Sequence, residues 1–271
     1  MRFIAALLAL LLALPGTAQT PEERARLDWA LQRGRLLFEV DRAAWVSTDD
    51  FREHLPQADQ RLIRGWTIER DGNGYLAVYF MIGDGNVRTV LYRARVESRR
   101  VVSRETFRPG RGPELTPLQR RIADVRDLVP QMNLRLCVER GANLAVIPPD
   151  SLDAPLDAYV LTPQVQTGVY PFGGHNRGTF SAAGALLSQR YFTNTCLTMG
   201  GQGEGAPPPG STPAGFGVTH LLDPSPTEIH VFLAIWSGMP IFVSTGEPMR
   251  IWEVTGDRIT LIDPSRFSNR P

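Results

Sequence analysis

The 271-residue sequence contains no lysine and almost no net charge. Its 29 basic residues other than histidine are all arginine, and 28 acidic residues balance them, which leaves a formal charge of +1. A protein dedicated to nucleic acid needs a clear basic excess, so this balance argues against that class. The missing lysine points to codon bias in the genome more than to a function.

Long hydrophobic runs are also missing, with one exception at the N-terminus. Residues 3–14 form an unbroken apolar run of 12 residues after Arg2, well short of the roughly 20 needed to span a bilayer. The small residues Gly16 and Ala18 follow, which is the layout of a cleaved secretory signal. We therefore expect residues 1–18 to be removed and the chain to be periplasmic or secreted. A retained anchor is the alternative.

The sequence has only two cysteines, Cys137 and Cys196. Two cysteines in an exported chain predict one disulfide, because the compartment is oxidising. Closing this loop would stabilise the fold by about 4 kcal/mol on the loop-entropy estimate. Two free buried thiols are the alternative, and a bonded pair argues against a cysteine nucleophile.

Several motifs of known chemistry are absent. The sequence has no Gly-x-Ser-x-Gly, no Gly-x-Gly-x-x-Gly that opens a helix, no Walker sequence and no His-Glu-x-x-His. The run that begins at Asp71 has the glycines and asparagine of a calcium loop. However, Tyr75 and Ile82 occupy its fifth and twelfth positions, where an EF-hand needs oxygen ligands. We interpret this run as a turn.

The N-terminal region predicts two helices and then an antiparallel meander. We expect one helix from Thr20 to Gly34, an extended piece at 36–40, and a second helix that residues 47–50 cap and Pro56 ends. Four runs of branched and aromatic residues follow, separated by three short connectors, of which the two at 71–74 and 83–86 contain the Gly and Asn that suit tight turns. They predict strands at 66–70, 75–82, 87–96 and 101–107.

The rest of the chain predicts a mostly antiparallel β domain with one leading helix. Residues 108–115, rich in Pro, Gly and Arg, are the expected linker. A capping box at Thr116 begins the helix, which ends before Pro130. Residues 198–215 lack apolar periodicity and are interpreted as a flexible surface loop. Strands are expected at 134–138, 143–147, 158–162, 178–181, 185–192, 216–222, 228–236, 241–244, 250–255 and 258–262.

The predicted fold class is therefore α+β. A helix-plus-meander unit at 19–107 is followed, after the linker, by a disulfide-stapled β-rich domain at 116–271.

Three of the four histidines offer a candidate metal site. If residues 216–236 form a hairpin, His220 faces His230, and opposed residues have Cβ atoms about 4.5–5.5 Å apart. Two such imidazoles can share zinc or a similar divalent metal, with His175 or Glu228 as a third ligand. The alternative, which we favour, is hydrogen-bonded core histidines, because His-x9-His is not a recognised ligand spacing.

Arginine is concentrated in residues 93–126, where ten arginines accompany four acidic residues. This excess of positive charge can contact anionic headgroups or acidic polysaccharide in the cell envelope. A solvated face beside a linker is the alternative. The candidate contact residues are Arg99, Arg100, Arg104, Arg108 and Arg111.

Five tryptophans raise the possibility of a carbohydrate-binding or peptidoglycan-binding surface. Trp45, Trp66, Trp236 and Trp252 lie in apolar runs and are interpreted mostly as core residues, whereas Trp29 lies on the first predicted helix.

Five short segments occur together with the signal-like N-terminus. They are Ala-Ala-Trp-x-x-Thr-Asp at 43–49, Leu-Thr-Pro-Gln at 161–164, Pro-Phe-Gly-Gly-His at 171–175, Phe-Thr-Asn-Thr-Cys at 192–196 and Pro-Thr-Glu-Ile-His-Val-Phe at 226–232. Together they resemble a family of exported proteobacterial proteins with no assigned activity. The resemblance implies an envelope location and no mechanism.

These observations predict a non-enzymatic binding or structural protein of the envelope, whose partner is an unknown envelope ligand or protein. The alternative is a metal-dependent hydrolase that uses the histidines of the C-terminal domain.

Overall fold

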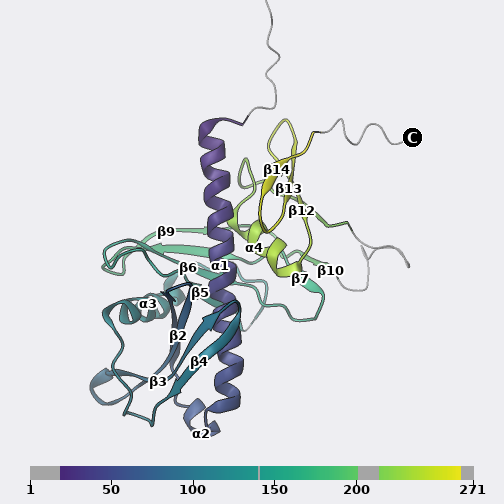
Figure 1. The fold of residues 1–271 in the computed structure, drawn as a ribbon. Coiled ribbons are helices and arrows are strands. Elements are labelled where there is room, and N and C mark those ends of the chain that lie inside the picture. Colours follow the sequence, from purple (N-terminus) through teal and green to yellow (C-terminus); the bar gives the residue numbers. More distant parts are fainter. Residues whose placement is uncertain (1–18, 140, 201–213, 264–271) are drawn as a thin grey trace, which may run out of the picture.

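A computed structural model describes residues 19–139, 141–200 and 214–263 of the chain. The predicted signal segment 1–18 lies outside these residues, and so does most of the loop predicted at 198–215. Within them the fold is α+β, with three four-stranded sheets placed around a long N-terminal helix (Figure 1).

The helices are α1 (Pro21–His54), α2 (Gln57–Gln60), α3 (Pro117–Leu128) and α4 (Glu228–Ser237), with short 3-10 turns at Asp84–Asn86 and Val129–Gln131. The first sheet contains β1 (Gly65–Asp71), β2 (Gly74–Ile82), β3 (Arg88–Glu97) and β4 (Arg100–Thr106). The second contains β5 (Asn143–Val146), β6 (Leu156–Leu161), β8 (Asn176–Phe180) and β9 (Leu186–Tyr191). The third contains β11 (Phe216–Thr219), β12 (Ile241–Thr245), β13 (Arg250–Val254) and β14 (Ile259–Leu261), and β7 (Val169–Pro171) pairs with β10 (Thr198–Gly200).

Helix α1 is continuous, so the prediction of two helices with an extended piece between them is wrong. Thr20 caps it as expected, but Gly34 lies in its interior. A Cβ at Gly34 would lie 2.5 Å from the carbonyl oxygen of Glu228 and 2.6 Å from the Cβ of Val231. The glycine therefore allows α1 and α4 to approach closely and does not end the helix.

The predicted meander is confirmed. Its strands pair antiparallel in the order β1-β2-β3-β4, and the first two of its three connectors supply the residues that tight turns favour. Gly72 and Asn86 have φ values of 57° and 62°, in the left-handed region that glycine and asparagine tolerate. The run beginning at Asp71 is thus a hairpin turn.

Helix α3 begins with the predicted capping box, formed by Thr116 and Gln119. The segment 108–115 runs beside β3, where Leu115 is buried and its N–H donates to the carbonyl of Arg88 at 3.1 Å. Helix α3 contributes Ala123 to a cluster with residues of the first sheet, and Ile122 to a cluster with residues of the second. Helix α3 therefore packs against the first sheet, which precedes the predicted linker, and against the second sheet, which follows it.

The disulfide between Cys137 and Cys196 is confirmed, with Cα atoms 5.3 Å apart. The segment 134–138 that leads into it is not the predicted strand. The side-chain amide of Asn176 accepts the N–H of Arg135 at 3.0 Å and donates to its carbonyl at 2.9 Å. The Asn176 side chain thus satisfies the two backbone groups of Arg135 that a neighbouring strand would otherwise bind.

The other strands of the second half are present with small shifts at their ends, except at 228–236, which is the helix α4. Seven consecutive residues from Glu228 to Ala234 are buried, so α4 has no polar face whose period could reveal a helix. It connects β11 to β12, which are parallel neighbours and so require a crossover. The predicted hairpin at 216–236 is therefore wrong.

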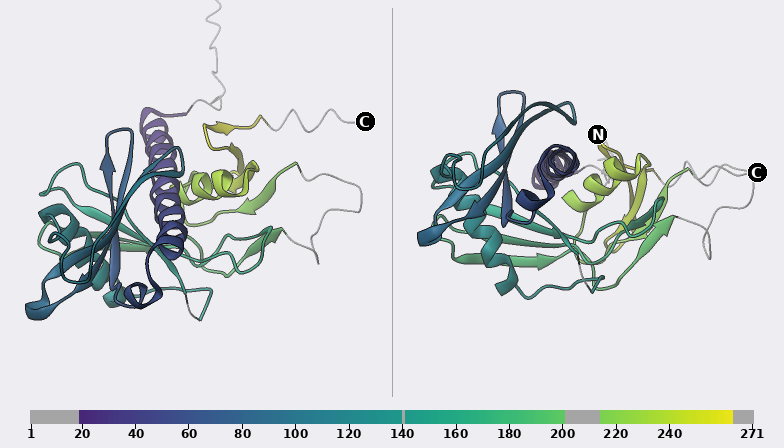
Figure 2. Two further views of the ribbon diagram at one scale, coloured as in Figure 1. Left: turned by 60° about the horizontal axis from the view of Figure 1, so that its bottom comes forward. Right: turned by 90° about the horizontal axis from the view of Figure 1, so that it is seen from below.

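Viewed along α1, the first sheet lies on one side of the helix and α4 with the third sheet on the other, while the second sheet runs beneath both (Figure 2). One buried apolar cluster includes Leu27 and Leu37 of α1, Tyr79 of the first sheet, Tyr159 of the second and Trp252 of the third. None of the helices in the described ranges is long and apolar enough to cross a bilayer.

Candidate functional site

The candidate site lies where the start of α4 meets the N-terminal half of α1. Thr227 precedes α4, and its N–H donates to Nδ1 of His230 at 3.0 Å. His230 thereby takes the place that Glu or Gln usually occupies in a capping box. This arrangement fixes Glu228 and His230 in the first turn, below α1.

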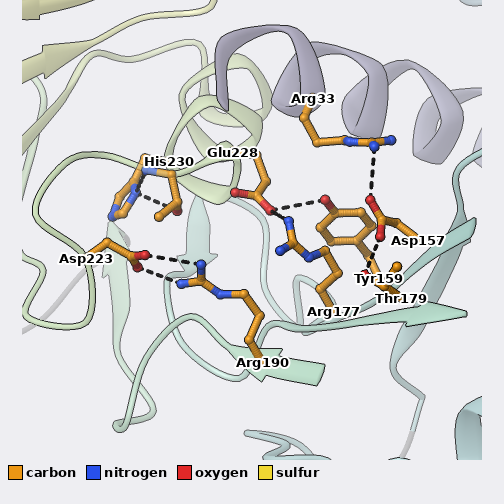
Figure 3. Close-up of polar contacts among 10 residues, drawn as sticks. Arg33, Asp157, Tyr159, Arg177, Thr179, Arg190, Asp223, Glu228 and His230 are labelled. Carbon is orange, nitrogen blue, oxygen red and sulfur yellow. Dashed lines mark hydrogen bonds and ion pairs between the residues drawn. The ribbon is translucent and has the colours of Figure 1, made fainter. Parts of the chain in front are cut away.

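Glu228 is a buried carboxylate with two partners from the second sheet (Figure 3). Its Oε1 accepts from Arg177 at 2.6 Å and from the hydroxyl of Tyr159 at 3.1 Å. Burial raises the pKa of Glu228, although the Arg177 charge opposes this. The Arg177 guanidinium also lies 5.2 Å from the centre of the Trp29 ring, so it connects α4, the second sheet and α1.

A second ion pair lies beside the first. Asp223 accepts two hydrogen bonds from Arg190, at 3.2 and 2.6 Å, and its Oδ2 is 2.7 Å from Nε2 of His220. Burial alone would raise the pKa of Asp223, but the hydrogen bonds from His220 and Arg190 outweigh it and hold that pKa far below its usual range. Asp223 is therefore an anion throughout the ordinary pH range.

A third pair ties α1 to the second sheet. Arg33 of α1 is 3.0 Å from Asp157, which also accepts from the hydroxyl of Thr179 at 2.7 Å. The three pairs form a row of opposite charges between α1, α4 and the sheet (Figure 3). Neighbouring charges of opposite sign satisfy one another where water is largely excluded.

The predicted neighbours His220 and His230 do lie side by side, with ring centres 4.8 Å apart. They meet because His220 follows β11 and His230 begins α4, and not through a hairpin. Burial lowers the pKa of His230 to about 3, so its ring is neutral. Its Nδ1 lone pair accepts the Thr227 N–H, which leaves the proton on Nε2.

His175 and Glu228, the other predicted metal ligands, have partners of their own. His175 is completely buried, Nδ1 accepts the N–H of Thr162 at 3.3 Å and Nε2 donates to the Pro171 carbonyl at 2.9 Å. Burial lowers the pKa of His175 to about 4, and both ring nitrogens are in use. In the part of the chain that the structure describes, no three His, Cys, Asp or Glu residues are grouped to hold a metal ion.

A cavity of about 340 Å³ opens beside these ion pairs. Its walls come from α1, from β9 and from the loop that leads into α4, and they include Arg26, Trp29, Arg190, Asp223 and Glu228. The Trp29 side chain is 43% exposed. The cavity therefore combines one indole ring with the paired charges of Arg190, Asp223 and Glu228 and with the exposed guanidinium of Arg26.

Sequence reasoning missed most of this site. Glu228 and the two histidines were named, but Arg177, Arg190 and Asp223 were not. Their partners lie 51 and 33 residues away along the chain, so no local pattern pairs them. The one available signal was the Pro-containing loop just before the candidate Glu228.

The candidate arginine surface is only partly free. Arg99 pairs with Glu39 at 2.8 Å and Arg104 with Asp50 at 2.6 Å. Arg100, Arg108 and Arg111 are exposed, and their side chains have no ion pair with any described residue. Contact with an anionic surface stays a hypothesis for these three.

The burial of the tryptophans differs in part from the prediction. Trp252 is completely buried and Trp66 and Trp236 are partly buried, but Trp45 is 43% exposed. The core interpretation is wrong for Trp45, because the unbroken α1 turns this side chain outward.

Comparisons of the chain with models of protein families, with curated proteins and with solved structures found no match, so the function has to be argued from this geometry.

Proposed function

We propose that this protein is a non-enzymatic binding protein of the cell envelope, and that the cavity beside Trp29 holds a small neutral saccharide. The observation that carries the proposal is the composition of the cavity wall. Two guanidinium groups of the wall, Arg26 and Arg190, are matched by two carboxylates, Glu228 and Asp223, and Arg177, which does not line the cavity, pairs with Glu228. The wall thus has strong hydrogen-bonding groups and no net charge.

A neutral, hydroxyl-bearing molecule suits such a wall. Each hydroxyl can donate to a carboxylate oxygen and accept from a guanidinium N–H, and hydrogen bonds to charged groups are the stronger ones. The indole of Trp29 can cover the apolar face of a sugar ring. A ligand with a net charge would instead disturb ion pairs that are already satisfied.

A binding role also fits the protonation states. The potential acids and bases of the site already have partners: Glu228 has Arg177, Asp223 has Arg190, and His230 has the Thr227 backbone. General acid–base catalysis needs a group that can exchange its proton near neutral pH.

Calorimetric titration tests the proposal directly. We expect N-acetylglucosamine and its β-1,4 disaccharide to bind, and the charged sugars glucosamine and glucuronate to bind more weakly. Trp29→Ala should weaken binding about fivefold, because an aromatic platform contributes about 1 kcal/mol. Trp45→Ala is the matched control, since this residue is equally exposed on the same helix but lies outside this cavity. Equal losses in both variants, or tighter binding of a charged sugar, would refute the assignment.

Export is the second part of the proposal. It is supported by the signal-like residues 1–18 and by the disulfide, which forms and persists in oxidising compartments. Cell fractionation should find the chain outside the cytoplasm with its N-terminus at Gln19. Retention in the cytoplasm with both thiols free would contradict it.

The metal-dependent hydrolase stays the alternative, and the contact between His220 and His230 is the observation that favours it. A shared metal would require His230 to exchange its Thr227 hydrogen bond for the ion. Elemental analysis of purified protein tests this alternative, and a stoichiometric divalent metal that His230→Ala abolishes would support it.

A further inference from the structure

A second cavity, of about 290 Å³, lies under the C-terminal half of α1, away from the site described above. It is placed where β1, the edge of the first sheet, comes near β5, the edge of the second. No pairing joins β1 to β5 among the described strands. Helix α1 covers this junction, and side chains from α1, β1 and β5 line the space between the two edges.

Four aromatic rings line this cavity. They are Trp45 and Phe51 of α1, Trp66 of β1 and Tyr79 of β2. The ring centres of Phe51 and Tyr79 are 4.6 Å apart, and Trp66 stacks on Tyr79 at 6.4 Å. The rings therefore hold one another in place.

Hydrogen bonds fix the deepest ring. The Tyr79 hydroxyl is 2.8 Å from the hydroxyls of Ser47 and Thr48 and donates to the carbonyl of Ala44 at 3.0 Å. Trp66 is fixed from behind, because the guanidinium of Arg126 lies 3.6 Å from its ring centre. The far face of Trp66 thus already binds a cation supplied by the protein itself.

One carboxylate, that of Asp41, also lines the cavity. Its side chain has no hydrogen bond and no ion pair with any residue that the structure describes. Three other acids removed from solvent, Asp50, Asp223 and Glu228, each have an arginine partner. Asp41 is half-buried, so its carboxylate faces the cavity beside aromatic rings without a partner from the described residues.

The surrounding charges do not satisfy it. Arg42 is its neighbour on α1, Arg52 lines the cavity with a side chain 64% exposed, and Arg126 of α3 lies behind Trp66. Burial raises the pKa of Asp41 to about 7, while the Arg42 charge lowers it only in part. A partner that brings a positive charge into the cavity would keep this carboxylate ionised.

We propose that this aromatic cavity binds a small organic cation, with its ammonium group beside the Asp41 carboxylate and against the rings of Trp45 and Phe51. Aromatic faces attract cations through the ring quadrupole, most strongly where water is excluded, and the carboxylate supplies the opposite charge. A bare metal ion fits poorly, because the cavity offers a single carboxylate. The volume lies at the low end for ligand sites, which restricts the ligand to a compact one.

Choline and its neutral isostere 3,3-dimethylbutan-1-ol make a matched pair of ligands for the test. They differ by one charged atom, so calorimetric titration at pH 8 measures the effect of the charge. We expect choline to bind at least tenfold more tightly than the alcohol. Similar affinities of the two, or binding of neither, would overturn the proposal, since the cavity would then be a site for apolar molecules or for none.

Variants locate the binding. Asp41→Asn should weaken choline at least tenfold and leave the weak affinity for the alcohol unchanged, whereas Asp28→Asn, an exposed acid on the same helix, should change neither. Trp45→Ala should weaken choline, and Trp29→Ala, which alters the other cavity, should not. Unchanged choline affinity in Asp41→Asn would refute the role of the carboxylate. The outcome is independent of saccharide binding at Trp29, so each proposal can fail alone.

Discussion

Replacing Asp41 by asparagine should stabilise the protein, and the gain should depend on pH. The pKa of this carboxyl rises from 3.8 to about 7 on folding, because the half-buried group is partly removed from water and has no partner among the described residues. The folded state therefore holds the proton more tightly than the unfolded state. The contribution of this group to the free energy of unfolding is fully present below about pH 4. It is lost progressively as the pH rises, and the protein stays less stable by that amount above pH 7.

The magnitude follows from that shift. At about 1.4 kcal/mol per pKa unit, the loss between pH 4 and pH 8 is at most about 4 kcal/mol, and contact with solvent in the cavity reduces it to about 2 kcal/mol. Asparagine has nearly the same shape and cannot ionise. Asp41→Asn should thus match the wild type at pH 4 and exceed its stability by about 2 kcal/mol or more at pH 8.

Urea denaturation at a series of pH values measures this difference, with the disulfide kept oxidised. Asp28→Asn serves as the control, because this side chain is exposed on the same helix. Choline should raise the denaturation midpoint of the wild type at pH 8 and raise that of Asp41→Asn much less at the same concentration. A difference between Asp41→Asn and wild type that is the same at pH 4 and pH 8 would show that Asp41 is not buried without a partner.

Three further variants test the packing. Gly34→Ala should lower the thermal midpoint, because the new methyl group would meet α4 at 2.5 Å and overpacking costs about 1–3 kcal/mol; Gly217→Ala, which has open space around it, should be nearly neutral. Arg177→Met should cost about 3–5 kcal/mol in urea denaturation, since it leaves the buried Glu228 unpaired, and the cost should shrink at pH 5, where that carboxyl can take a proton. Replacing both cysteines with serine should cost about 4 kcal/mol in the same assay, and no loss would mean that the loop is already ordered without the bond.

Local chemistry made the first sheet and α3 predictable. A tight turn needs specific residues at positive φ, and Gly72 supplies one such residue between β1 and β2. A capping box requires two side chains three residues apart, and Thr116 and Gln119 provide them. Such signals depend only on neighbours in the sequence, so they survive without knowledge of the fold.

The errors arose where distant contacts override local signals. Gly34 suggests the end of a helix in isolation, but in the structure it accommodates the backbone of α4. The branched residues Ile229 and Val231 favour a strand, yet α4 is buried on all sides. Both errors have the same origin, because neither helix can be recognised without the other.

The site shows the same limit. The contact of His220 with His230 was predicted from a hairpin that does not exist, and a parallel crossover produces it instead. The arginine that neutralises Glu228 of α4 comes from β8 of the second sheet, 51 residues earlier in the chain. Charge pairs across sheets leave no periodic trace in a sequence, so composition could indicate balanced charge but could not say which charges meet.

The long helix explains why the predicted boundary at 108–115 does not divide the core. The N-terminal half of α1 packs on α4, with Gly34 at the contact, while Tyr79 of the first sheet bonds to Ser47 near its other end. Trp29 and Trp45 are 16 residues apart, which is about 24 Å along a helix and close to opposite faces. One rigid element therefore forms a wall of both cavities, and unfolding either half of the chain would open the cavity in the other. We infer that the two candidate sites belong to a single cooperative unit.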